Sequence, residues 1–144
     1  GQLEEMISHL EAAIKIQPDL SKAYNRIGDG LQQLGQLNKA IEYYQKAIKY
    51  NSKFSEAYNN LGNIFKNTGQ LDDAVNSYKK ALEISPKHKG ALEYQGEMYL
   101  TLGKLAKAEA NLKKLEGICF LGCEEEKILK ESISKYKAGK KSNY

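Results

Sequence analysis

Cys119 and Cys123 lie four positions apart and are the two cysteines of a 144-residue chain. Three interpretations fit this C-x3-C spacing: two buried free thiols that pack as small apolar groups, a disulfide that pins a turn, or a redox or metal role. A zinc site needs four ligands, and neither a second cysteine pair nor a histidine accompanies these two residues. We therefore predict no metal ion, and a small redox or metal-handling protein built on the pair remains the alternative function.

The other residue types that carry out chemistry are sparse. The two histidines, His9 and His88, are too far apart in the chain to share a metal ion. Asp72 and Asp73 open a predicted helix, where carboxylates stabilise the positive end of the helix dipole, so we do not interpret them as an acid–base pair. Nucleophile-elbow, phosphate-loop and metalloprotease motifs do not occur in the sequence. We predict that the protein is not an enzyme and has no catalytic residue and no cofactor.

Composition excludes further classes of protein. The chain has 22 Lys and Arg against 18 Asp and Glu, and because both signs are interspersed, the net charge of +4 predicts no nucleic-acid partner. A weaker alternative, a binder of acidic partners or nucleic acid, depends only on the lysines of residues 135–141. The longest apolar run covers residues 118–121, far below the ~20 residues of a transmembrane helix, so no membrane span is predicted.

A 34-residue repeat dominates the sequence. Residues 21–54 and 55–88 are identical at 13 aligned positions, and residues 89–122 continue in the same register with more differences. Within a copy, apolar residues recur at helical spacing, as Tyr58 and Leu61 do, which predicts two amphipathic helices in each repeat. A repeat of this length that cannot bury its own apolar face predicts a stack of helix pairs.

The glycines and alanines of the repeat have predicted roles in packing and turns. Gly62 and Ala74 are expected to let the two helix backbones of a repeat approach closely, and Ala81 is expected to leave room for the next repeat. Gly69 and its equivalents fall between the helices, where a left-handed residue ends the first one. Gly139 is expected to end the last helix.

The order of these residues resembles the tetratricopeptide repeat family, over roughly residues 3–118. The best copy reads Tyr58, Leu61-Gly62, Phe65, Ala74, Tyr78, Ala81 and Pro86. The resemblance implies an all-α fold, a right-handed superhelix or α-solenoid of helix-turn-helix repeats with a C-terminal capping helix. Residues 115–125 also resemble the ending of small exported bacterial proteins of this family. That resemblance favours a periplasmic or exported protein, with the cytoplasm as the alternative.

The chain is expected to form a single domain of repeats. A partial repeat with only its second helix covers 1–20, repeats cover 21–54 and 55–88, a divergent repeat covers 89–122, a capping helix covers 123–139 and a tail covers 140–144. The expected helices span 3–17, 21–34, 37–50, 55–68, 71–84, 89–102, 105–116 and 124–138.

The family resemblance implies a non-enzymatic scaffold that binds a partner protein or extended peptide in a concave groove lined by the first helices. The predicted groove residues are Asn25, Arg26, Asp29, Asn59, Asn60, Asn63, Lys66, Tyr94 and Glu97. Amide side chains both donate and accept hydrogen bonds, as a peptide backbone requires. The alternative interpretation is that these residues form ordinary solvated helix faces. Family members that bind chaperone tails hold a carboxylate with a set of polar and basic residues, of which this chain keeps only Asn60.

The two ends of the chain differ from the repeats. The apolar stripe of Leu3, Met6, Ile7 and Leu10 lacks a first-helix partner, and we predict a homodimer through this N-terminal edge helix. At the other end, Cys119 and Cys123 are the candidate disulfide of the turn into the capping helix.

Overall fold

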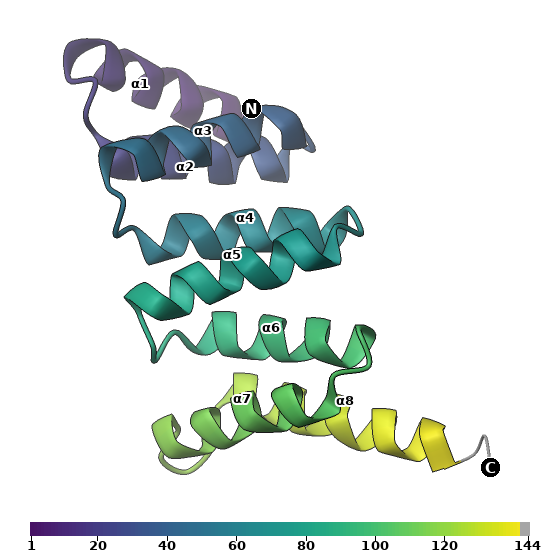
Figure 1. The fold of residues 1–144 in the computed structure, drawn as a ribbon. Coiled ribbons are helices and arrows are strands. Elements are labelled where there is room, and N and C mark those ends of the chain that lie inside the picture. Colours follow the sequence, from purple (N-terminus) through teal and green to yellow (C-terminus); the bar gives the residue numbers. More distant parts are fainter. Residues whose placement is uncertain (142–144) are drawn as a thin grey trace.

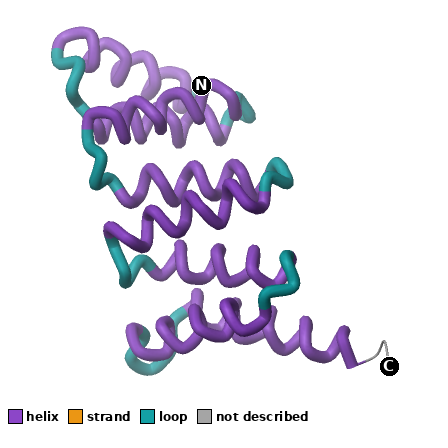
Figure 2. The backbone as a smooth tube through the Cα atoms, in the orientation of Figure 1, coloured by secondary structure: helices purple, strands orange, loops and turns teal. Residues whose placement is uncertain are grey.

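The computed structural model describes residues 1–141, and within that range the chain forms eight α-helices and no strand (Figures 1 and 2). The helices are α1 (Gln2–Ile16), α2 (Ser21–Gln33), α3 (Leu37–Tyr50), α4 (Ser55–Asn67), α5 (Leu71–Ile84), α6 (Lys89–Thr101), α7 (Leu105–Ile118) and α8 (Glu124–Lys141). The predicted all-α solenoid is confirmed. The prediction that Gly139 ends the last helix is wrong, because α8 continues to Lys141. The rest of the predicted tail, 142–144, lies outside the described residues.

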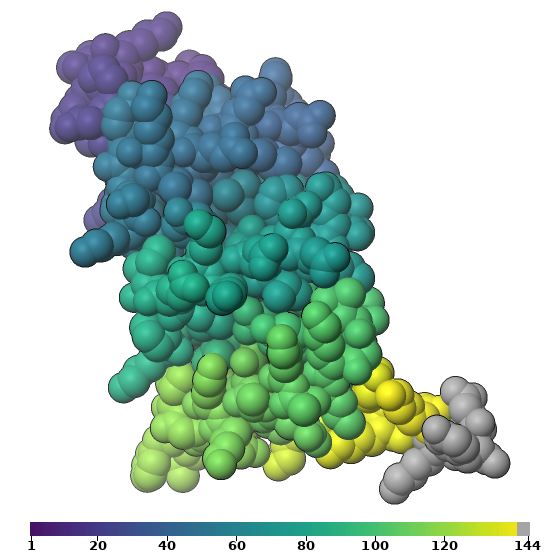
Figure 3. Space-filling view, viewed as in Figure 1, coloured from purple at the N-terminus to yellow at the C-terminus, as the bar shows by residue number. Residues whose placement is uncertain are grey.

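Consecutive helices pair side by side, and the pairs stack along one axis (Figure 1). The repeats therefore appear as successive bands along an elongated molecule (Figure 3). The first helices of neighbouring repeats adjoin, with α2 next to α4, α4 next to α6, and α6 next to α8. We call the face formed by α2, α4, α6 and the start of α8 the inner face.

The same turn ends the first helix of each repeat. Gly35, Gly69 and Gly103 have φ values of 75°, 79° and 73°, the left-handed region that favours glycine. After each glycine, a backbone N–H donates back across the turn; the bond from Gln70 to the Phe65 carbonyl is 2.8 Å long. This is the Schellman arrangement that satisfies the last carbonyls of a helix. A Cβ at Gly35 or Gly69 would meet no atom within 4 Å, so the backbone angle and not space requires glycine there.

The helical glycines of the first two full repeats lie against tyrosine rings. A Cβ on Gly62 would lie 2.6 Å from a ring carbon of Tyr78, and a Cβ on Gly28 would lie 2.6 Å from a ring carbon of Tyr44. The glycines make room for buried tyrosine rings of the paired helices. In the third repeat, Gly96 faces Leu129 of α8, at 2.7 Å from its would-be Cβ, so the capping helix fills this position.

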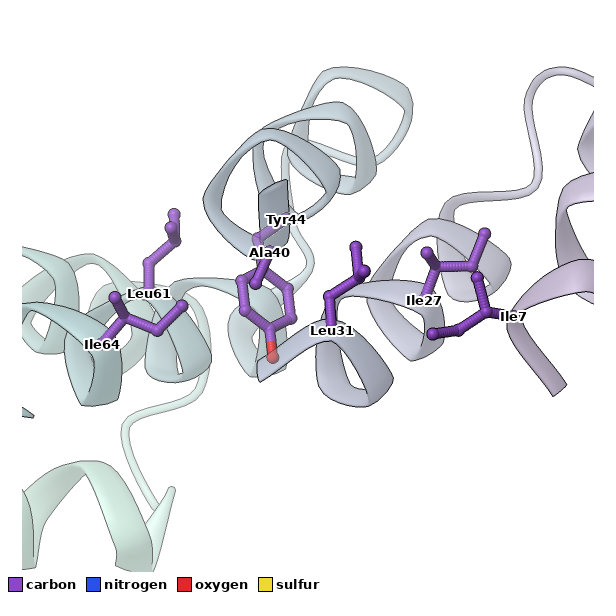
Figure 4. Packing of buried hydrophobic residues seen from close by; sticks show 7 residues of the cluster. All are labelled: Ile7, Ile27, Leu31, Ala40, Tyr44, Leu61 and Ile64. Carbon is purple, nitrogen blue, oxygen red and sulfur yellow. The ribbon is translucent and has the colours of Figure 1, made fainter. Parts of the chain in front are cut away.

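The core is a series of apolar clusters along the stack. One cluster runs through α1, α2, α3 and α4 and contains Ile7, Ile27, Leu31, Ala40, Tyr44, Leu61 and Ile64 (Figure 4). A second cluster joins α6, α7 and α8 around Leu92, Leu115 and Leu129, none of which is exposed. Because each cluster spans only adjacent helices, every repeat depends on its neighbours for burial.

Candidate functional site

The middle of the inner face carries a network of polar side chains that crosses from one repeat to the next. The Nδ2 atom of Asn60 donates to Oδ1 of Asn25, at 3.2 Å, and to Oδ1 of Asp29, at 3.1 Å. Asn25 also donates to Oε1 of Glu56, at 3.3 Å. These bonds link α2 to α4, so three predicted groove residues belong to one hydrogen-bonded unit.

Buried tyrosines from the second helices support this network from below. The Tyr44 hydroxyl donates to Asp29 Oδ1, at 2.8 Å, and the Tyr78 hydroxyl donates to Asn63 Oδ1, at 2.7 Å. Burial raises the pKa of Asp29, and the Tyr44 hydrogen bond opposes that rise. Burial also raises the pKa values of both tyrosines, so their hydroxyls remain donors at any ordinary pH. Sequence reasoning missed this role; the tyrosine that recurs at positions 44 and 78, opposite Gly28 and Gly62, was the available signal.

Two shallow cavities follow the network. One has a volume of about 420 Å³ and is lined by Asp29, Gln32, Gln33, Asn60 and Asn63. The other, of about 310 Å³, is lined by Lys22, Asn25, Arg26, Phe54 and Glu56. The structure thus brings five of the predicted groove residues to adjoining hollows of one face. Asn25 is only 2% exposed, so it positions Asn60 and is not itself a contact surface.

The C-terminal end of the inner face has a different character. Lys66 Nζ lies over the Tyr94 ring, 4.2 Å from its centroid. Burial raises the pKa of Glu93 to about 7, helped by the negative charges of Glu97 and Glu125 and opposed by Lys66. Glu97 accepts a hydrogen bond of 3.3 Å from Ser132 of α8. Lys66 therefore faces carboxylates of its own chain, which the sequence did not indicate.

A further cavity of about 420 Å³ lies away from the inner face, between α5, α6 and α7. Its lining combines Leu82 and Tyr99 with Lys79, Lys107 and Lys114. Asn111 at its base donates to Gln95 Oε1 at 2.9 Å and to the Leu92 carbonyl at 3.1 Å, so its amide protons are bonded within the chain. This cavity is the structural competitor of the inner face as a binding site.

The N-terminal stripe is less open than predicted. Ile7 is 8% exposed and belongs to the first core cluster, and Met6 and Leu10 pack against the same cluster. Leu3 is half-buried and lies outside that cluster. The homodimer stays a prediction, and Leu3 is the residue of the stripe best placed to test it.

Cys119 and Cys123 form a disulfide, with their Cα atoms 5.5 Å apart. The loop between them holds Leu121 at a φ of 69° and exposes Phe120 and Leu121. Glu126 is the third potential ligand of this group. Metals bind thiolates, and bonded sulfurs are not thiolates, so the pair in this state does not fit a metal site. His88 accepts a hydrogen bond from the Ala91 backbone and caps α6.

Comparisons with known proteins agree with the geometry. The family described as tetratricopeptide repeat matches residues 55–88, and the related family described as TPR repeat matches residues 28–69. No curated protein sequence matches the chain. No helix within residues 1–141 combines the length and apolar character needed to cross a membrane.

Solved structures give the same result. A crystal structure of MamA protein is 26% identical, with a TM-score of 0.71, over 79% of this chain and 62% of that one. A tetratricopeptide repeat protein from Parabacteroides merdae is 21% identical, with a TM-score of 0.84, over 96% of this chain and 55% of that one. The TPR domain of Arabidopsis OM64 is 22% identical, with a TM-score of 0.72, over 81% of this chain and 95% of that one. The chain thus spans about three fifths of the first two proteins.

The 34-residue helix pairs, the glycine turns and these matches define a repeat solenoid, and the chain carries tetratricopeptide repeats over residues 28–88. Domains of this family mediate protein–protein interactions, and their fold is typically a non-enzymatic scaffold.

Proposed function

We propose that this protein is a non-enzymatic scaffold that binds an extended segment of a partner protein along the inner face, which serves as its concave groove. The observation that carries the proposal is the asparagine network of α2 and α4. Asn60 uses its amide protons on Asn25 and Asp29, and Asn63 uses its oxygen on Tyr78. Asn60 Oδ1 and Asn63 Nδ2 make no hydrogen bond within residues 1–141. One acceptor and one donor are thus presented by fixed side chains.

A peptide backbone needs this combination. Each of its residues offers one N–H donor and one carbonyl acceptor, which a side-chain amide can satisfy with little preference for sequence. Because Asn60 and Asn63 are held by neighbouring groups, binding would cost little side-chain entropy.

We further propose that the protein works in an oxidising compartment, periplasmic or exported, with the cytoplasm as the alternative. The disulfide between Cys119 and Cys123 supports an oxidising compartment, because disulfides persist there.

The test selects peptides from a random dodecapeptide library displayed on phage and measures the affinity of the best binder by fluorescence anisotropy. Asn60→Ala combined with Asn63→Ala should weaken binding at least about tenfold, because each lost amide pairing costs about 1–3 kcal/mol. Asn38→Ala with Asn76→Ala, two exposed asparagines on α3 and α5, is the matched control. Circular dichroism verifies that both variants are folded.

A variant of the competing cavity completes the test. Lys79→Ala with Lys107→Ala alters the hollow between α5 and α7 and should leave the affinity unchanged. If this pair weakens binding and the Asn60 and Asn63 exchange does not, the site lies in that cavity and the proposal fails.

A further inference from the structure

Two largely buried side chains of the inner face, Asn59 and Glu93, carry an acceptor without a hydrogen-bond donor among the described residues, and of these acceptors only Asn59 Oδ1 is itself fully buried. The Glu93 side chain takes part in no hydrogen bond and no ion pair within the described residues, although Glu93 is only 7% exposed. Oδ1 of Asn59 is buried and likewise unbonded among residues 1–141. Both residues occupy the fifth position of their repeat, on the adjoining helices α4 and α6. Burying an acceptor without a donor costs free energy, so such groups call for a ligand that donates.

The charges around Glu93 favour a cation. Glu97 of α6 and Glu124 and Glu125 of α8 add negative charge on the same side, and all three raise the pKa of Glu93. Among the described residues, Lys66 of α4 is the one cation that lowers it. Since the Lys66 ammonium lies over the Tyr94 ring and not within 4 Å of a carboxylate, four carboxylates share one distant positive charge.

The arrangement does not suit a metal ion. Metal ligands must converge. In the part of the chain that the structure describes, Cys119, Cys123 and Glu126 are the only set of three or more His, Cys, Asp or Glu residues whose ligand atoms all lie within 4.8 Å of one another. The Glu93, Glu97 and Glu125 carboxylates are more widely spread. A guanidinium or ammonium group is larger than a metal ion, has several donors and has no acceptor, so it can reach dispersed acceptors one by one.

We propose that the end of the inner face formed by Asn59, Glu93 and Glu97 is a pocket for a basic side chain, arginine or lysine, of the bound partner segment. This inference rests on the proposed function and specifies its partner: an extended segment with a cation opposite α6 and uncharged backbone contacts opposite α4. The Tyr94 ring lies near the same carboxylates, and the Lys66 ammonium over that ring shows that this end of the inner face accommodates a cation. The segment differs in charge from the terminal carboxylate that other family members hold.

The test uses the peptides selected from the dodecapeptide library on the full chain. The selected sequences should share an arginine or lysine at one position. Replacing that residue by glutamine in a synthetic peptide should weaken its binding to the unaltered protein at least about tenfold. On Glu93→Gln combined with Glu97→Gln, the basic and glutamine peptides should bind alike, which makes the pair of exchanges a double-mutant cycle.

Two controls keep the test decisive. Asp72→Asn with Asp73→Asn removes two exposed carboxylates from α5 and should preserve the tenfold discrimination. Glu125→Gln alone, at a half-buried position in the first turn of α8, should reduce the discrimination in part even if the double variant is poorly folded. Selected peptides without a shared basic residue, or discrimination that survives Glu93→Gln with Glu97→Gln, would overturn this inference.

The inference and the proposed function fail separately. Peptides that depend on Asn60 and Asn63 but carry no basic position would refute the pocket and leave the scaffold function standing. A second outcome is that binding of an arginine-containing peptide is weakened by exchange of Glu93 but not by exchange of Asn60 and Asn63. That outcome would support the pocket and refute the proposed path of the peptide across the middle repeat.

Discussion

The Tyr78 ring occupies the space that Gly62 leaves open: a Cβ on Gly62 would lie 2.6 Å from the nearest ring carbon. Tyr78 is fully buried, and its hydroxyl reaches Asn63 on the inner face at 2.7 Å. A glycine inside a helix costs about 1 kcal/mol relative to alanine, so a glycine that recurs at the same repeat position, as Gly28 and Gly62 do, calls for a compensating contact. The compensation is a tyrosine that fills the core and orients a side chain of the candidate site.

We predict that Gly62→Ala destabilises the protein by about 1–3 kcal/mol, because the added methyl group displaces the Tyr78 ring. Gly117→Ala is the matched control: Gly117 lies in α7 with no atom within 4 Å of its would-be Cβ, so alanine there should stabilise by about 0.5–1 kcal/mol. Urea denaturation followed by circular dichroism measures both. Equal effects of the two exchanges would show that helix propensity, and not the ring, decides the outcome.

The sequence predicted where the helices begin and end better than it predicted which residues of different helices contact one another. Helix bounds follow from local spacing and from turn glycines such as Gly69, so α1 to α7 begin and end within two residues of the prediction. The end of α8 was misplaced because Gly139 resembles a stop signal, whereas a helical glycine is tolerated where no turn forms. The repeat pattern did not indicate the partner of Gly96, because that partner, Leu129, comes from α8, outside the repeats.

The candidate site was predicted as a set of residues, without its internal bonding. Position in the repeat indicated that Asn25 and Asn60 share a face, but their hydrogen bond joins residues 35 positions apart and depends on how the repeats stack. The burial of Glu93 was not predicted, because α8 supplies part of its surroundings and is outside the repeat pattern.

The disulfide between Cys119 and Cys123 should stabilise the junction of α7 and α8. Closing a loop of this size removes entropy from the unfolded chain that corresponds to about 2 kcal/mol. Cys119→Ala combined with Cys123→Ala should lower the thermal midpoint, and dithiothreitol should lower that of the unaltered protein but not that of the variant. Identical midpoints with and without reductant, together with two titratable thiols before reduction, would contradict a bonded pair.

The N-terminal edge should mediate a weak homodimer. Leu3 lies on the apolar stripe of α1 but outside the core cluster that Ile7 joins, so Leu3→Lys should oppose association without unfolding the helix. Multi-angle light scattering should show a mass that rises with concentration for the unaltered protein and stays monomeric for the variant. Glu5→Lys, an exposed position on another face of α1, is the control. A strict monomer at millimolar concentration would refute the dimer.

Glu93 should make the stability of the protein depend on pH near neutrality. Its pKa is raised from 4.5 to about 7 in the folded protein, so between these values the folded state binds more protons than the unfolded state. Stability from this group is therefore fully present below about pH 4.5 and is lost as the pH rises through about 7. The groups that face it are Glu97 on α6, Glu124 and Glu125 on α8, and Lys66 on α4.

Glu93→Gln removes the titrating group while keeping its shape. At pH 5 the variant and the unaltered protein should have nearly the same free energy of unfolding, and at pH 8 the variant should be more stable by about 1 kcal/mol, once solvent screening is allowed for. Urea denaturation at intervals from pH 5 to pH 8 measures the difference. Glu116→Gln, at an exposed position of α7, should change stability by no more than about 0.5 kcal/mol throughout. A Glu93→Gln difference that does not grow with pH would mean that the carboxyl is solvated in the folded protein, and the pocket would then lack the buried acceptor on which cation binding depends.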